Sequence, residues 1–300
     1  MIILRNNKLD FHLTNQYYDS QERFHNLHFL EKTKIQVRPW LEGKTIDAWR
    51  HSRMYAFVNP ITKADPKTSW LTVGDGRYGT EAHYLTGRVK DVLATDIADA
   101  FLKEAKNAGY IKKYKRENAE KLSFENNSFD YVLCKESYHH FPRPTIALYE
   151  MLRVVKKAVV LIEPNDVKTR GFSWKRFWSI DDPKTQVNHF EVSGNYVYSI
   201  SRREIEKVAL GVGLPAVAFS GFDDIYIEKS STDKIADNTF SFKRIKAILW
   251  FLDILYKLRM RDRSLLVAII FKERPSSKMI RELKLFGYDV RMLPKNPYIR

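Results

Sequence analysis

The chain has 300 residues, of which 44% are hydrophobic, so it can bury the core of one large α/β domain with additions or of two modest domains. Its single cysteine, Cys134, excludes a disulfide framework and a zinc site built from cysteines. We therefore expect no bound metal and a reducing, cytoplasmic location. The 51 Lys and Arg against 36 Asp and Glu give a formal charge of +15, which favours anionic partners. Because the cations are spread along the chain, nucleic acid is the less favoured of these partners.

The first part of the chain and the remainder follow different patterns. Residues 1–65 show no clear alternation of strands and helices, although the stretch 46–58 predicts a helix. Pro60 and Pro66 then separate this region from one in which short apolar strands alternate with helices. We expect strands at 70–73, 92–95, 129–134, 158–162, 225–227 and 265–271, and helices at 81–85, 98–109, 144–155 and 201–211. Such alternation is typical of a doubly wound α/β sheet.

A glycine-rich turn lies between the first expected strand and the first expected helix. Gly74, Gly76 and Gly79 form the pattern G-x-G-x-x-G, in which the backbone turns sharply and lets a ligand approach closely. Asp96 ends the next strand, where its carboxylate can accept hydrogen bonds from both hydroxyls of a ribose. Dinucleotides and S-adenosylmethionine both fit this geometry, so the turn alone predicts only a nucleotide site.

The segment after this turn is more specific. The run 117–132, with Ala119-Glu120 and the strand opening Phe129-Asp130, resembles the third and fourth motifs of class I S-adenosylmethionine-dependent methyltransferases of the small-molecule type. The segments 138–142, 150–153 and 163–164 are similar to later motifs of that family, so the resemblance covers residues 66–165 and continues more weakly to about 230.

The resemblance implies an α/β fold with a Rossmann-like, doubly wound and mostly parallel sheet of seven strands. It divides the chain into an N-terminal helical lid at 1–65, a methyltransferase domain at 66–275 and a C-terminal extension at 276–300. Within the domain, the core motifs lie at 70–165 and an acceptor-side insertion lies at about 166–200.

The same resemblance implies S-adenosyl-L-methionine as cofactor, with S-adenosyl-L-homocysteine as product, and it assigns residues to it. The glycine turn with Asp75 packs against the methionine and the sugar, Asp96 holds the ribose and Ile97 lies on the adenine. Further expected contacts are Asn118 and the backbone of Ala119 at the adenine edge, Lys135 and Glu136 near the methyl group, and Arg53 or Arg50 of the lid at the methionine carboxylate.

Two positions depart from the family pattern. Thr72 stands where the family usually has an acid, and Asn118 stands where it often has Asp. Both departures leave a non-catalytic S-adenosylmethionine-binding protein as an alternative.

The acceptor side of the expected site has fewer signals. His140, beyond the fourth strand, is our candidate general base, with packing as the alternative, and Glu163 either lines the pocket or anchors a loop. The aromatic segment 172–198 suits a small-molecule or glycan-like acceptor, anionic groups included, although packing within the insertion explains it equally. We expect O-methylation, with RNA or protein methylation as the alternative.

An apolar stretch with basic flanks occupies residues 245–258. It is too short to span a bilayer. It could lie on an anionic membrane surface, mediate dimerisation or, as the default, pack inside the fold before the last strand. The oligomeric state stays open.

Overall fold

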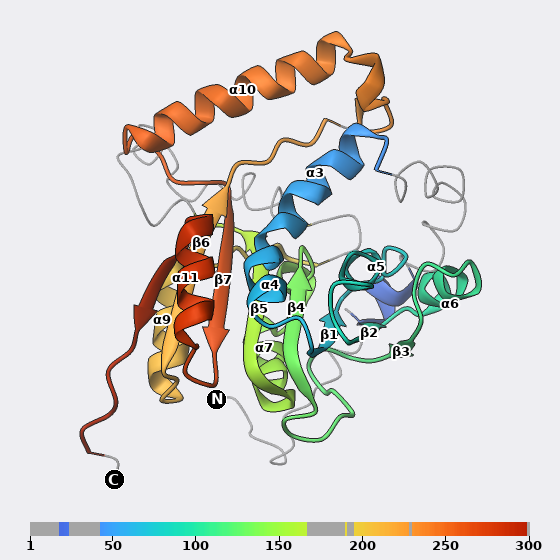
Figure 1. Ribbon diagram of the computed structural model, residues 1–300. Helices are drawn as coiled ribbons and strands as arrows, with labels where there is room; N and C mark the ends of the chain where they lie inside the picture. Colours follow the sequence, from blue (N-terminus) through green and yellow to red (C-terminus); the bar gives the residue numbers. More distant parts are fainter. Residues whose placement is uncertain (1–17, 24–42, 167–189, 191–194, 228–229, 299–300) are drawn as a thin grey trace, which may run out of the picture.

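The computed structural model describes residues 18–23, 43–166, 190, 195–227 and 230–298. Figure 1 shows a central sheet with helices on both faces and one long helix beyond the ends of the strands. The described part of the chain contains eight strands in the order β3-β2-β1-β4-β5-β7-β6-β8. Their bounds are β1 Ser69–Val73, β2 Asp91–Asp96, β3 Tyr114–Arg116, β4 Phe129–Lys135, β5 Val155–Pro164, β6 Ala216–Phe222, β7 Leu265–Phe271 and β8 Asp289–Met292.

The expected Rossmann-like, mostly parallel α/β sheet is confirmed. Strands β3, β2, β1, β4 and β5 pair in parallel, whereas β7 runs antiparallel between β5 and β6. Val73 lies opposite both Thr95 and Cys134, so β1, β2 and β4 end together. The chain leaves β1 toward β2 on one side and returns to β4 on the other, and ligands bind beyond the carboxyl ends of the strands at such a reversal.

Two hydrophobic clusters cover the two faces of the sheet. The helices are α3 Ile46–Tyr55, η1 Ala56–Val58, α4 Asn59–Ala64, α5 Thr80–Leu85, α6 Ala100–Asn107, η2 Tyr138–His140, α7 Pro144–Val154, α9 Arg202–Gly211, η7 Ile235–Asp237, α10 Phe240–Lys257 and α11 Ser277–Phe286. Side chains of α4, α5, α6 and α11 pack on one face, and those of α7 and α9 pack on the other. The central strands are therefore buried on both faces, which explains their nearly continuous apolar sequences.

The expected strand at 225–227 is wrong, and the expected number of seven strands is too small. The strand that pairs with β7 is β6, whose Ala218 and Phe219 face the two opposite hydrophobic clusters. Asp223 follows directly and accepts hydrogen bonds from Arg261 and Arg263, so the chain leaves the sheet before Ile225. Compared with the six strands placed from the sequence, the additional ones are the short β3 and the C-terminal β8.

The segment described above as a C-terminal extension contributes to the same sheet. Strand β8 pairs antiparallel with β6, and α11 packs against α4. Met279, Leu283 and Tyr288 from this segment are buried in one hydrophobic cluster.

The apolar stretch 245–258 lies in α10, and the expectation that it packs inside the fold is wrong. Only Phe242 and Ile245 of this helix are buried, because α10 contacts the body along one face and stands beyond the sheet (Figure 1). Among the described residues, we find no helix with the length and apolar character that crossing a membrane requires.

Candidate active site

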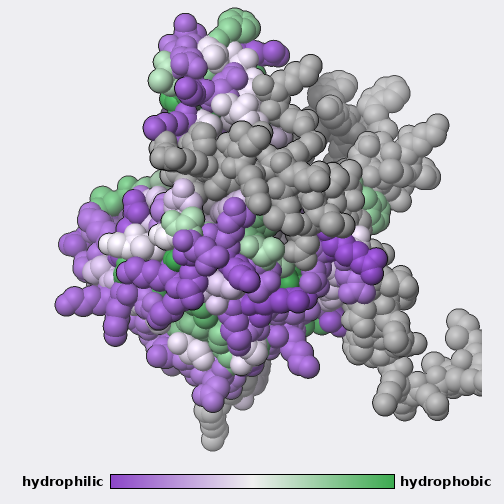
Figure 2. Space-filling model, turned by 90° about the vertical axis from the view of Figure 1, so that its right-hand side faces the viewer, coloured by the Kyte–Doolittle hydropathy of each residue, from purple (hydrophilic) through white to green (hydrophobic). Residues whose placement is uncertain are grey.

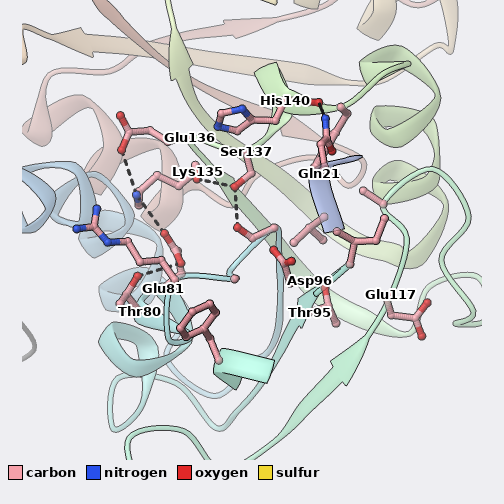
Figure 3. Close-up of a pocket in the computed structure, with 18 of the residues that line it drawn as sticks. Gln21, Thr80, Glu81, Thr95, Asp96, Glu117, Lys135, Glu136, Ser137 and His140 are labelled. Carbon is pink, nitrogen blue, oxygen red and sulfur yellow. Dashed lines mark hydrogen bonds and ion pairs between the residues drawn. The ribbon is translucent and has the colours of Figure 1, made fainter. Parts of the chain in front are cut away.

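A pocket opens where β1, β2 and β4 end, and Figure 3 shows its lining residues in close-up. Its walls come from the glycine turn after β1, the end of β2, the loop after β3 and the segment after β4. The predicted residues that line it are Gly74, Gly76, Asp96, Ile97, Asn118, Ala119, Lys135, Glu136 and His140. Parallel strands thus bring residues from four separate segments of the sequence to one pocket.

The glycine turn is held tightly against both neighbouring strand ends. Gly74 has a φ of +75°, and a Cβ there would lie 2.4 Å from the Cβ of Ser137, whose hydroxyl donates to the Gly74 carbonyl at 2.7 Å. A Cβ on Gly76 would lie 2.6 Å from Oδ2 of Asp96. Glycine is therefore required at both positions for this close approach.

Asp75 does not line the pocket, and its carboxylate caps α5 instead. Its oxygens accept hydrogen bonds from the Thr72 hydroxyl at 2.8 Å and from the backbone N–H groups of Glu81 and Ala82 at 3.1 and 2.9 Å. Gly79, at φ +60°, is also a structural residue, because a Cβ there would meet Ile111 at 2.9 Å. These two residues shape the turn from outside the cavity, and Thr72 helps to hold the carboxylate of Asp75.

Asp96 lies at the base of the pocket, beside the turn. Burial raises its pKa to about 6, although backbone N–H groups of Ala98, Gly76 and Ile97 favour the ionised form. The N–H of Ala98 donates to its Oδ1 at 2.9 Å. Nearby, Asn118 accepts the N–H of Glu120 at 2.9 Å, so part of its hydrogen-bonding capacity supports its own loop.

The opposite wall contains a buried charged group around Lys135. Its ammonium lies 3.1 Å from Glu81, 3.4 Å from Glu136 and 3.1 Å from Nδ1 of His51. Burial disfavours the ammonium ion, but the two carboxylates outweigh this effect and raise the pKa of Lys135. Burial and the neighbouring cations lower the pKa of His51, so its neutral ring can accept a hydrogen bond from Lys135.

Comparisons with known proteins agree with this geometry. Residues 71–162 match a family model described as a methyltransferase domain. This part of the chain therefore carries a methyltransferase domain. No curated protein matches the sequence.

Solved structures support the fold of the methyltransferase domain. One is the YcgJ protein from Bacillus subtilis, with 18% identity, a TM-score of 0.50 and coverage of 75% of this chain and 100% of that one. Another is a protein proposed to be a sarcosine dimethylglycine methyltransferase from Galdieria sulphuraria, with 17% identity, a TM-score of 0.50 and coverage of 85% and 98%. At these identities the likeness concerns the fold alone.

The N-terminal region contributes other residues to the pocket than those expected. Arg53 lies outside the pocket, where its Nη2 donates to the carbonyl of Asp223 at 2.8 Å, and Arg50 binds Asp224. The helical segment 18–23 instead contributes Tyr18 and Gln21 to the pocket. This short segment has no apolar periodicity that could have revealed its position.

Arg77, which sequence reasoning missed as a site residue, also lines the pocket. Its guanidinium binds Asp47 at 2.8 Å, and its side chain stays 43% exposed. Its position between Gly76 and Gly79 was the available signal, although a place in this turn alone does not decide which side chain faces the pocket, since Asp75 lies outside it.

Glu163 of the methyltransferase domain anchors the segment after β4. This fully buried carboxylate accepts the backbone N–H groups of Ser137 and Tyr138, each at 3.0 Å, and contacts Nδ1 of His139 at 2.6 Å. The ring of His139 packs on that of His140, with centroids 4.0 Å apart. Glu163 therefore fixes the loop that carries His140, as the loop-anchoring alternative proposed.

His140 lines the pocket next to Asn195. Its Nδ1 lies 3.0 Å from Nδ2 of Asn195, and its carbonyl accepts a hydrogen bond from Gln21 at 2.6 Å. A row of exposed aromatic rings follows, because Tyr196 contacts both Phe190 and Tyr198 edge to face. The other expected acceptor-side aromatics, Trp174, Phe177, Trp178 and His189, lie outside the described residues.

Proposed function

We propose that this methyltransferase is active, takes its methyl group from S-adenosylmethionine and transfers it to a hydroxyl oxygen of a small-molecule or glycan-like acceptor. One observation carries the proposal: the pocket brings the glycine turn and Asp96 together with His140, whose ring contacts Asn195 beside a row of aromatic rings. The first pair suits a nucleoside, and the second suits a ring-containing acceptor.

The residues of the pocket fit the cofactor. The close approach of Gly76 to Asp96 leaves no room for a side chain, so the backbone of the turn itself faces a ligand held by the carboxylate. Ionised Asp96 can accept both ribose hydroxyls, and the side chains of Ile97 and Phe101 supply an apolar surface for the adenine. The cofactor, when bound, supplies an activated methyl group.

The amino acid end of the cofactor carries one ammonium and one carboxylate group. Arg77 and Lys135 offer cations at the wall beside the turn, and Glu81 and Glu136 offer carboxylates. This charge pattern matches an amino acid zwitterion. We therefore assign the carboxylate contact to Arg77 rather than to Arg53.

His140 is the candidate for removing the proton of the acceptor hydroxyl. It can accept a proton at Nε2 only while Nδ1 carries a hydrogen, and this tautomer requires Asn195 to present its amide oxygen to the ring. With the amide nitrogen facing Nδ1, Nε2 keeps its hydrogen, and His140 orients the hydroxyl by donating to it. In both cases Asn195 selects the tautomer.

The exposed rings of Tyr196 and Tyr198 extend from this histidine toward solvent. Aromatic faces stack well on the flat surfaces of sugars and other rings, which supports a ring-containing acceptor.

The test is the formation of S-adenosylhomocysteine with ring-containing hydroxyl compounds, and with RNA and protein for comparison. We expect turnover with a compound of the first class. His140→Ala should lower kcat by about a hundredfold or more without changing cofactor affinity, as is typical for loss of a general base. The matched control is His83→Ala, since His83 contacts the carbonyl of Tyr110 away from the pocket. Turnover with RNA or protein alone would contradict the proposed acceptor class.

A further inference from the structure

Helix α10 has two faces with different surroundings. The inner face packs on α3, where Phe242 meets Trp49 edge to face with centroids 5.1 Å apart and Ile245 joins the same cluster. Toward its end, Tyr256 stacks under the guanidinium of Arg263, which also binds Asp253. These contacts fix the orientation of the helix on the body.

The outer face exposes large apolar side chains. Phe240, Phe251 and Leu258 are 81%, 53% and 63% exposed, and their spacings of 11 and 7 residues bring them to one side of the helix. Trp250, 68% exposed, lies next to this row. Soluble proteins rarely expose such a group of large apolar residues unless it binds something.

The charged residues on and after α10 are mostly basic. Lys243 and Arg244, which are both exposed, lie beside the apolar row. Residues 240–263 contain seven Lys and Arg against two Asp, and Asp253, the one acid within the helix, is paired with Arg263 and Lys257. The outer face therefore combines apolar side chains with cations and presents no carboxylate.

The combination of apolar and basic side chains distinguishes between possible binding partners of the outer face. A second copy of the chain would bring cations against cations, and each copy carries a formal charge of +15. An anionic lipid surface accepts both features, because apolar side chains enter the interface, Trp favours it, and Lys and Arg bind the acidic headgroups. Figure 2 shows hydrophobic and hydrophilic surface side by side on the part that stands above the body.

We propose that the outer face of α10 docks this protein onto the surface of an anionic phospholipid bilayer. The helix lies along the interface rather than across the membrane. Since α10 stands beyond the carboxyl edge of the sheet (Figure 1), docking would turn the edge that carries the pocket toward the lipid. The proposal does not depend on methyl transfer.

The experiment uses the full chain and vesicles of phosphatidylcholine, either pure or with part of it replaced by phosphatidylserine. We expect the protein to sediment with the anionic vesicles, to do so less as salt is raised, and to stay in solution with the neutral ones. Lys243→Glu with Arg244→Glu, and separately Phe251→Glu, should lower the partition coefficient about tenfold or more. All three residues are exposed, so circular dichroism should show an unchanged fold.

Matched controls lie on α11, where Lys278, Lys284 and Leu285 are exposed. Lys278→Glu with Lys284→Glu, and Leu285→Glu, should retain at least half of the binding. Equal losses in both sets would overturn the proposal, because net charge rather than α10 would then control binding. Failure of the intact chain to bind anionic vesicles would also overturn it.

Two other binding partners of the outer face, a second copy of the chain and nucleic acid, would give different results. If Phe251→Glu converts a dimer to a monomer in light scattering and leaves vesicle binding intact, the face is a dimer interface. If Lys243→Glu with Arg244→Glu weakens binding of an RNA oligonucleotide but not of vesicles, the partner is nucleic acid. Either result would overturn the proposal.

Discussion

At the scale of single residues, the pocket depends on how closely Asp96 approaches the glycine turn. Sequence reasoning predicted both partners, because each occupies a fixed place in a strand–turn–helix–strand pattern. The same reasoning misplaced Arg53, since the direction of that side chain depends on how α3 packs against the end of β6. Short-range geometry could be predicted here, whereas contacts between distant segments could not.

The raised pKa of Asp96 predicts how cofactor affinity changes with pH. Burial raises this pKa to about 6, and the ionised carboxylate is the form that accepts the ribose hydroxyls. S-adenosylmethionine affinity should therefore be constant above about pH 7 and should fall below pH 6, by up to about tenfold per pH unit. Asp96→Asn should remove this dependence. An identical pH profile for both proteins, measured by calorimetry, would show that another group titrates.

The two arginines offer a direct comparison. Arg77 lines the pocket, whereas Arg53 binds the carbonyl of Asp223 outside it. Arg77→Ala should weaken S-adenosylmethionine binding about tenfold, which corresponds to about 1.4 kcal/mol, and Arg53→Ala should change it less than twofold. The reverse order in equilibrium dialysis would restore the sequence-based assignment to Arg53.

At the scale of elements, the segment after β4 is held in place by one buried carboxylate. Sequence patterns predicted β4, β5 and α7 because their apolar residues follow local periodicities. The role of Glu163 depends on the parallel pairing of β4 with β5, which brings it under Ser137 and Tyr138. For the same reason the strand β6 was missed: its pairing with β7 decides its position, and the residues 225–227 have an equally strand-like sequence.

Substitution of Glu163 should therefore affect both stability and catalysis. Glu163→Gln replaces one acceptor oxygen with a donor facing N–H groups, which should lower the free energy of unfolding by about 1–3 kcal/mol. The same change should lower kcat, because η2 carries His140. Glu125→Gln, at an exposed position, should stay within about 0.5 kcal/mol of the wild type. Urea denaturation that shows equal stability for both variants would contradict the anchoring role.

At the scale of the whole molecule, the C-terminal segment completes the fold. Residues 276–300 are assigned from the sequence to an extension because they lie beyond the part of the chain that resembles the family. In the structure β8 pairs with β6, and α11 covers part of one face of the sheet. Such long-range closure of a sheet has no local signature.

Truncation tests this contribution. Removing residues 276–300 deletes the buried Met279, Leu283 and Tyr288. Since losing one buried Leu or Met side chain costs about 2–5 kcal/mol, and domains are stable by about 5–15 kcal/mol, we expect an unfolded or aggregated product. Removing only residues 295–300, whose described side chains are exposed, should leave the melting temperature nearly unchanged. Equal melting temperatures for the two truncated chains would show that the methyltransferase domain folds without α11 and β8.

The proposed function requires that the pocket at the ends of β1, β2 and β4 binds S-adenosylmethionine through Asp96. Isothermal titration calorimetry on three proteins tests it most directly: the wild type, Asp96→Ala, and Asp91→Ala as the control at the other end of the same strand, where Asp91 pairs with Lys113 at the surface. We predict saturable binding by the wild type and by Asp91→Ala, and a loss of more than about tenfold in affinity for Asp96→Ala. Absence of binding by the folded wild type, or equal affinities for all three proteins, would show that Asp96 does not hold S-adenosylmethionine in this pocket.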